Sequence, residues 1–320
     1  MGIFRRRRRR GAPSPRDGEP DETFPFLTVG EAARLRAMVR EMFAEEGIES
    51  EIHPGHLAAA DGWHFGLHNL FATCHNTPGG ERAWPGVVRA HVAKLARINA
   101  EPSPADLSVE SLLSRAFIRV CGESTLPSVS GFRYRRRVGG DLIELLACDS
   151  PDAVAYLTDT EVERVGADRL RAAGVENLLT EPFGEIHWLD APGSARFGVL
   201  LGDSVYTASR LLILDDVLRR ATGDPVSPHG VLVSVPNRHQ LAFHRLVDAS
   251  LVGALEGMTR FTIDGFSDGV GGVSPHIYWR APGGGELQQL TEIEKPGEVS
   301  VRVEGEFAEV VQTLLNRRGN

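Results

Sequence analysis

The chain has 320 residues, of which 42% are apolar and 24% charged, and this ordinary globular composition excludes a disordered or fibrous protein. No apolar run approaches the roughly 18–20 residues that a membrane span needs. The net charge of −8 conceals seven arginines and no acid in residues 1–16, so the rest holds 28 basic against 43 acidic side chains, a balance that does not favour nucleic-acid binding across its surface.

Residues 1–25 contain mostly Arg, Pro, Gly, Asp and Glu, and we predict a flexible arm, because such a segment buries too little to offset the entropy of ordering. A solubilising tail is one interpretation. The other is a weak electrostatic contact with anionic lipid, aided by Ile3 and Phe4, or with nucleic acid. The candidate polyanion-binding residues are Arg5, Arg6, Arg7, Arg8, Arg9 and Arg10.

Residues 26–100 are predicted to form a helix–hairpin–helix unit. Thr28 and Glu31 make a capping box, and apolar residues at helical spacing continue to Gly47. Asp61-Gly62 suits a two-residue hairpin turn, with a second strand over 63–72. The second helix carries an apolar stripe, Val88, Val92, Leu95 and Ile98.

Six of the eleven histidines fall between positions 53 and 91, which suggests a metal site. With a turn at Asp61-Gly62, His53 becomes a diagonal neighbour of His68, and two ligands share one face. A catalytic zinc needs three protein ligands at about 2.0–2.2 Å, and the pattern offers no third one. We therefore predict no metal and no cofactor, and histidines on a solvated or interface face.

Residues 101–104 are expected to link this unit to a larger one over 106–320. The apolar run 231–235 is typical of a central strand buried on both faces. The predicted fold class is α/β (α+β), with a mixed sheet and packed helices. We expect strands near 116–121, 141–148, 153–157, 183–189, 196–201, 230–235, 240–246, 276–280 and 299–303, and helices near 160–178, 204–221, 248–263 and 306–316.

The best candidate for a ligand site lies where two predicted strands end, at 202–204 and 236–239. Ligands of open α/β sheets settle beyond the carboxyl ends of such strands, and a helix starting near 204 would add its positive end. Arg238 suits a carboxylate or phosphate, and His239 or His244 suits proton transfer near neutral pH. The ligand-binding candidates are Asp203, Ser204, Asn237, Arg238 and His239.

Structural roles compete with these assignments. Asp203 or Ser204 as a helix cap explains the same residues as a hydrolase nucleophile, and the second glycine of the nucleophile elbow is absent. A β-turn with Arg238 paired to an acid competes with the ligand site.

Two further patterns also have both a structural and a functional interpretation. Arg133, Arg135 and Arg137 alternate along an extended segment, which is either a solvated strand edge or an anion-binding strip. The glycines of 269–272 follow a predicted helix and do not fit a phosphate loop, so we predict a flexible loop there.

Several short pieces of sequence follow one another in a set order: Pro85-Gly86-Val87-Val88, then Ala172 with Asn177-Leu178, Gly198-Val199-Leu200-Leu201-Gly202-Asp203-Ser204 running into Thr207-Ala208-Ser209-Arg210-Leu211-Leu212, and Val233-Ser234-Val235-Pro236-Asn237-Arg238 followed by Leu241. In these pieces the chain resembles the YtpQ-like family of uncharacterised bacterial proteins, over most of residues 26–290. The family is a domain of unknown function, so the resemblance implies an architecture and no reaction. His239 stands where the family usually has an acid.

Cys74, Cys121 and Cys148 are far apart and odd in number, which favours a reducing compartment, and no signal peptide follows the arginine run. We therefore expect a cytoplasmic, non-catalytic binding or regulatory protein, whose partner the sequence does not identify. Two alternatives stay open: an enzyme acting on a small anionic substrate, and an adaptor that reaches a membrane surface or nucleic acid through the arm.

Overall fold

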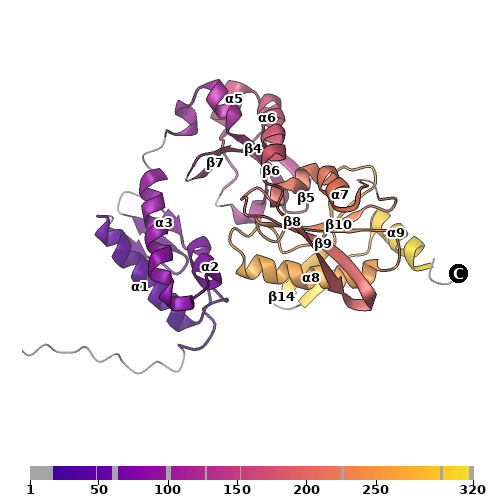
Figure 1. Ribbon diagram of the computed structural model, residues 1–320, viewed down its shortest axis with the longest axis horizontal. Coiled ribbons are helices and arrows are strands. Elements are labelled where there is room, and N and C mark those ends of the chain that lie inside the picture. The colour runs from indigo at the N-terminus through magenta and orange to yellow at the C-terminus, as the bar shows by residue number, and fades with distance from the viewer. Residues whose placement is uncertain are drawn as a thin grey trace, which may run out of the picture. The chain divides into compact units, whose positions relative to one another are not determined.

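The computed structural model of the chain describes residues 17–47, 49–59, 64–98, 102–126, 128–151, 153–224, 227–295 and 298–316. The chain divides into two compact units, with the boundary between Lys94 and Leu95 (Figure 1). The combination of helices and sheets confirms the predicted α/β (α+β) class. The described strands pair antiparallel, so the prediction of a mixed sheet is wrong. The six arginines of the arm, Arg5 to Arg10, lie outside the described residues.

The start of the first unit is packed from residue 17 onward. The Phe24 side chain is 1% exposed and lies against Phe71, with ring centroids 4.7 Å apart. Asp21 forms an ion pair with Arg36 at 3.0 Å. The predicted flexible arm is therefore wrong for residues 17–25, because Phe24 supplies apolar area that the average composition of the segment concealed.

The helix α1 (Val29–Glu45) begins at the predicted capping box. The backbone N–H of Glu31 donates to the hydroxyl of Thr28 at 3.2 Å, and the N–H of Thr28 donates to the Glu31 carboxylate at 2.8 Å. This reciprocal pair satisfies two of the backbone donors that a helix start leaves open. The buried face of α1 is Gly30, Ala32, Leu35, Val39 and Phe43.

The predicted hairpin of the first unit is part of a three-stranded antiparallel sheet, which consists of β1 (Ser50–Ile52), β2 (His56–Ala59) and β3 (His64–Gly66). Its register sets His56 opposite Gly66, one residue away from the predicted pairing, and the turn residues lie outside the described ones. The strand predicted over 63–72 is wrong beyond Gly66, where α2 (His68–Asn76) begins. A 3-10 turn η1 (Gly80–Arg82) and the predicted second helix, α3 (Trp84–Ile98), follow.

The described residues of the second unit form two larger sheets and a two-stranded hairpin. In the first, the order is β4-β6-β5, and β7 also pairs with β6. The helix α6 packs on β4 so closely that a Cβ atom on Gly174 would lie 2.7 Å from the backbone N of Ile118. The helix predicted over 160–178 is in fact two, because Gly166, at φ 98°, ends the first one. The elements are η2 (Pro104–Asp106), α4 (Val109–Ser114), β4 (Ala116–Gly122), η3 (Glu123–Thr125), β5 (Arg136–Gly139), β6 (Leu142–Asp149), β7 (Val154–Tyr156), α5 (Asp159–Val165) and α6 (Ala167–Thr180).

The second sheet has six strands in the order β13-β12-β10-β11-β9-β8, with antiparallel pairing throughout the described residues. All four residues of β10 are buried, which confirms the predicted central strand. The strands are β8 (Glu185–Ala191), β9 (Ala195–Leu201), β10 (Val231–Ser234), β11 (Gln240–Arg245), β12 (Tyr278–Arg280) and β13 (Gln288–Gln289), and η4 (Pro192–Ser194) joins the first two.

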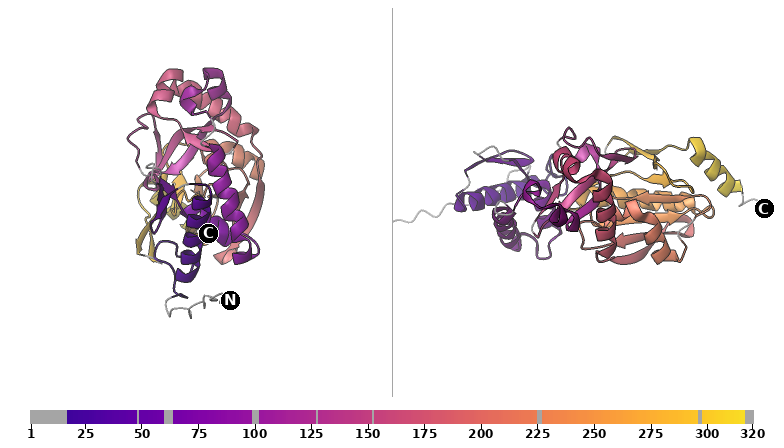
Figure 2. Two further views of the ribbon diagram at one scale, coloured as in Figure 1. Left: turned by 90° about the vertical axis from the view of Figure 1, so that its left-hand side faces the viewer. Right: turned by 90° about the horizontal axis from the view of Figure 1, so that it is seen from above.

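Helices cover both faces of this sheet. α8 (Leu251–Asp268) and α9 (Gly305–Asn316), the last helix in yellow in Figure 2, bury side chains on one face. η5 (Ala208–Ile213) and α7 (Leu214–Thr222) cover the other, and this second core also contains Val120 and Leu142 of the first sheet. A hairpin of β14 (Thr291–Lys295) and β15 (Glu298–Val301) precedes α9. None of the helices in the described ranges combines the length and apolar character of a membrane span.

Candidate anion-binding site

The two segments predicted to form a ligand site lie side by side at one end of neighbouring strands, because β9 and β11 are antiparallel and the end of β9 meets the start of β11. The backbone N–H of Gly202 donates to the carbonyl of His239 at 3.1 Å. The N–H of Ala208 donates to the carbonyl of Arg238 at 3.0 Å. The loop after β9 and the turn before β11 are thus held together by backbone hydrogen bonds.

Asp203 and Ser204 lie in a series of bends and turns rather than at a helix start. The first helical residue is Ala208, so the prediction of a helix that begins near 204 and directs its positive end at the site is wrong. The Ser204 hydroxyl donates to the Glu181 carboxylate at 2.6 Å, and no described histidine side chain bonds it, so it is not an activated nucleophile. Asp203 is exposed and borders, with His239, a pocket of about 520 Å³.

Asn237 is a structural residue of the turn. Its side chain is buried, and its amide donates to the carbonyl of Gly265 at 2.8 Å and to Gln240 Oε1 at 3.0 Å. Its Oδ1 accepts from the N–H of His239 at 3.0 Å. Because these bonds use its amide and its oxygen inside the protein, Asn237 is a poor candidate for binding a ligand.

The glycine loop 269–272, predicted to be flexible, packs against this turn. The N–H of Arg238 donates to the carbonyl of Gly271 at 2.9 Å. Gly271 has φ 74°, and a Cβ atom there would lie 2.7 Å from Cδ of Arg238. The glycines therefore allow a close approach that fixes the stem of Arg238, and their density in the sequence was the signal of that approach.

His239 orients its neighbour and is already engaged at both ring nitrogens. The guanidinium Nε of Arg238 donates to His239 Nε2 at 3.0 Å, and His239 Nδ1 lies 3.1 Å from the carbonyl oxygen of Gly202. This network assigns a neutral imidazole with its proton on Nδ1. Burial lowers the pKa of His239, and the charge of Arg238 lowers it further. The histidine therefore holds Arg238 in place and is not free to carry a proton.

Arg119 of β4, which the sequence analysis did not single out, is close enough to Arg238 for its charge to lower the pKa of that residue. Its guanidinium carbon is 5.4 Å from the ring centroid of Tyr156 and 6.0 Å from that of Tyr206. The pKa of Arg238 is lowered first by burial and then by the charge of Arg119, whereas Tyr156 acts in the opposite direction. We call Arg119, Arg238 and Tyr156 the two-arginine cluster. A lone cation in the otherwise apolar strand Ala116–Gly122 was the signal for it.

Neither guanidinium of the two-arginine cluster forms an ion pair with a carboxylate among the described residues, and both arginines are partly buried. The predicted arginine strip behaves differently. Arg133, Arg135 and Arg137 pair with Asp159 and Glu163, with Glu123, and with Glu286, respectively. Carboxylates compensate their charges, and only Arg137 belongs to a strand. The interpretation of this segment as an extended anion-binding strip is therefore wrong.

The thiol and the phenol closest to the cluster stay protonated near neutral pH. Burial raises the pKa of the Cys121 thiol to about 11 and that of Tyr156 to about 12. The Tyr206 ring stacks on Phe117 at 4.1 Å, and its hydroxyl donates to Asp149 Oδ1 at 2.9 Å. Burial raises the pKa of Asp149. The Tyr156 hydroxyl therefore remains a hydrogen-bond donor near neutral pH.

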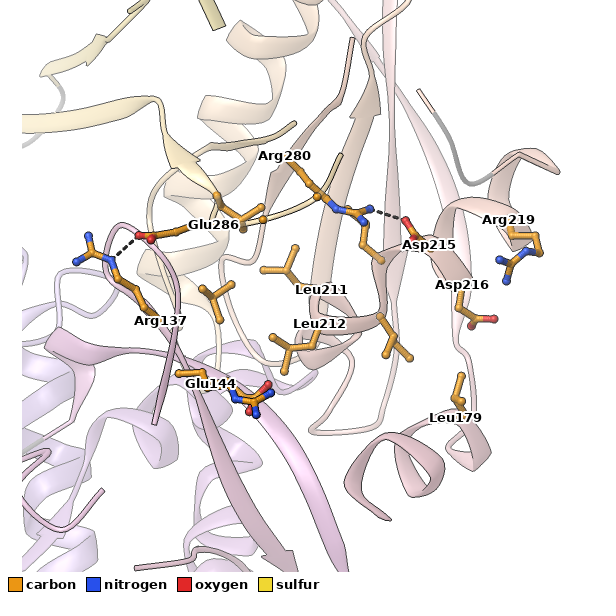
Figure 3. A pocket seen from close by; sticks show the side chains of 17 residues that line it. Arg137, Glu144, Leu179, Leu211, Leu212, Asp215, Asp216, Arg219, Arg280 and Glu286 are labelled. Carbon is orange, nitrogen blue, oxygen red and sulfur yellow. Dashed lines mark hydrogen bonds and ion pairs between the residues drawn. The ribbon is translucent and has the colours of Figure 1, made fainter. Parts of the chain in front are cut away.

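A larger pocket of about 630 Å³ lies elsewhere in the second unit, with Leu211 and Leu212 at its centre (Figure 3). Arg137 pairs with Glu286 and Arg280 pairs with Asp215, each at 2.5 Å, at its margins (Figure 3). Because these charges are already compensated, the pocket is a weaker candidate for an anion than the two-arginine cluster.

The histidines of the first unit do not gather as predicted. His53 stacks on His56 with centroids 4.5 Å apart, whereas His68 and His75 lie against the ring of Phe26. The pairing of His53 with His68 is wrong, because His68 starts a helix. Across the described ranges, no three His, Cys, Asp or Glu side chains are grouped as metal ligands.

Comparison of the chain with protein-family models, curated proteins and solved structures finds no match.

Proposed function

We propose that this protein is a cytoplasmic, non-catalytic binding protein for a small anion, a carboxylate or a phosphate, held between Arg119 and Arg238. One observation carries the proposal: two partly buried guanidiniums, close enough for the charge of one to act on the other, form no ion pair with a carboxylate among the described residues. Burying a charge is unfavourable unless it is paired. A bound anion would compensate both cations and accept the hydrogen bonds that a guanidinium fork provides.

Binding is favoured over catalysis because the groups beside the cluster lack the required protonation. The thiol of Cys121 and the hydroxyl of Tyr156 stay protonated near neutral pH, and the imidazole of His239 is engaged at both nitrogens. A nucleophile or general base needs a pKa near the working pH. The buried, unpaired state of the three cysteines supports a reducing compartment.

An enzyme acting on a small anionic substrate is the second candidate, and Asp149 favours it. Burial raises the pKa of its carboxyl, and Glu181 adds to the shift. A carboxyl group whose pKa is raised, within reach of the charge of Arg119, is suited to exchange a proton with a bound anion. Asp149→Asn would then abolish turnover of the substrate while retaining its binding. The adaptor role of Arg5 to Arg10 and the resemblance to the YtpQ-like family remain predictions.

Thermal unfolding with inorganic phosphate, and separately with succinate, at constant ionic strength tests the proposal. A ligand that binds only the folded state stabilises it by about 2.7 kcal/mol at 100 times its Kd. We expect the midpoint of the wild type to rise with at least one of the two anions. Arg119→Met and Arg238→Met should abolish the rise, because methionine keeps the apolar stem and removes the charge.

The matched control is Arg260→Met, which removes an exposed arginine of α8 that pairs with Glu256 at 3.6 Å. This variant should respond to the anions like the wild type. An equal rise in the wild type, Arg238→Met and Arg260→Met would contradict the proposal, and so would the lack of any response in the wild type.

A further inference from the structure

The strand β8 is open along one side. It pairs with β9, and no other strand in the described part of the chain pairs with it (Figure 1). Five of its seven residues are exposed, and the central two are apolar: Trp188 is 43% exposed and Leu189 is 37% exposed. An open edge of this kind presents unpaired backbone N–H and C=O groups, which can pair with a further strand.

The two edges of the second sheet differ in their protection. At the far edge, β13 has only two residues, Gln288 and Gln289, and a very short strand offers little to pair with. In contrast, β8 has seven residues and contains no proline, lysine or arginine. Its register with β9 runs from Glu185 to Ala191 without a bulge. Of the usual devices that prevent edge-to-edge pairing, β8 lacks the proline, the lysine, the bulge and the short length, and its two acids lie near its ends.

We propose that β8 pairs antiparallel with β8 of a second copy of this chain, about a two-fold axis at Trp188, so that the two six-stranded sheets become one. A two-fold dimer is the commonest closed assembly of soluble proteins, and its interface joins the same surface of both subunits. The exposed apolar pair at the centre of the strand would be covered by its own copy.

The charges along β8 are compatible with this register. Trp188 faces its own copy, which forms a cross-strand aromatic pair. His187 faces Leu189 of the second copy, and Asp190 faces Ile186. The two acidic residues of the strand, Glu185 and Asp190, therefore never lie opposite an acid. This self-complementarity selects a second copy rather than an unrelated strand as the partner.

The mass in solution tests the proposal. Sedimentation or light scattering at about 100 µM should give about 70 kDa, twice the 34.8 kDa of one chain. Leu189→Lys should weaken the dimer at least about tenfold in Kd, because it places charges at the centre of the interface. Val303→Lys, which changes a residue 48% exposed outside the strand, should leave the mass unchanged. A 34.8 kDa mass for the wild type would overturn the proposal.

The register is tested by cross-linking. The three natural cysteines are buried, so an introduced cysteine is the only exposed thiol. Under mild oxidation, a mixture of His187→Cys and Leu189→Cys proteins should form the mixed disulfide faster than either protein cross-links alone. Val303→Cys should cross-link slowly. Equal rates in all of these samples would contradict the register, and melting temperatures within a degree or two of the wild type would show that the variants are folded.

Discussion

The guanidinium Nε of Arg238 lies 3.0 Å from Nε2 of His239, so a neutral imidazole accepts a hydrogen bond from a partly buried cation. Protonation of His239 would remove the acceptor and place a third positive charge beside Arg119 and Arg238. The geometry of the two-arginine cluster therefore depends on an uncharged histidine.

The stability of the protein should decrease as the pH falls from about 7 to about 5. Burial lowers the pKa of His91, His239, His244 and His276 in the folded state. Below about pH 6.5 the unfolded chain therefore binds protons that the folded chain does not, and unfolding becomes easier. Denaturant unfolding at several pH values measures the slope.

His239→Gln isolates one part of this dependence. Glutamine keeps an acceptor for Arg238 and does not titrate, so the slope should decrease relative to the wild type by up to about 1.4 kcal/mol per pH unit. Asp149 acts in the opposite direction, because its raised pKa favours the folded state as the pH falls. An unchanged slope in His239→Gln would show that His239 titrates equally in both states.

Removal of one partner of the ion pair between Arg171 and Glu144 should be strongly destabilising. The two side chains are 11% and 12% exposed, with Nε and Oε1 2.6 Å apart. Arg171→Met leaves a buried carboxylate uncompensated, and we expect a loss of about 3–5 kcal/mol in the free energy of unfolding. Arg133→Met removes an ion-paired arginine that is 73% exposed, and it should change the free energy of unfolding far less than Arg171→Met does. Similar losses in both variants, measured by denaturant unfolding, would refute the distinction.

Gly271→Ala should destabilise the fold by about 1–3 kcal/mol, because alanine at a positive φ is strained and its Cβ meets the stem of Arg238. The same change should weaken the response to phosphate, since it displaces that guanidinium. Gly86→Ala in α3 is the matched control. Its Cβ meets nothing within 4 Å, so it should be neutral or stabilising by about 0.5–1 kcal/mol. If both variants bind and melt alike, the close approach at Gly271 is unimportant.

Phe24→Ala should cost about 3–5 kcal/mol, the usual loss for a fully buried phenylalanine. Deletion of residues 1–25 should therefore destabilise the first unit. Deletion of residues 1–16 alone should leave the melting temperature within a degree or two, because the prediction of a dispensable arm still applies to them. A large effect of the shorter deletion would refute that prediction.

The sequence predicted elements best where a pattern had one interpretation. The capping box at Thr28 and the apolar run of β10 each specify a single local structure, and both were located correctly. The segment after Gly66 was ambiguous: its apolar residues fit a period of two as well as a helical one, and packing against Phe24 favours the helix.

Only part of the candidate site could be predicted from the sequence. Segments 202–204 and 237–239 each follow or precede a strand, so their meeting at one sheet edge could be anticipated. Arg119 is about 120 residues away from Arg238 in sequence, on a strand of another sheet, and only the tertiary fold brings the two together. The helix expected at Ser204 failed because Ser204 bonds Glu181 and the chain turns before η5.

The shared core of the second unit has a mechanical consequence. Val120 of β4 and Leu142 of β6 are buried with Val233 and Phe243 of the other sheet, so the two sheets cannot slide apart without opening a common interior. Arg119 stands one residue before Val120, and its spacing from Arg238 is therefore set before any ligand arrives. A site held in this way would lose little conformational freedom on binding the proposed anion, and its fixed spacing would favour anions of one size.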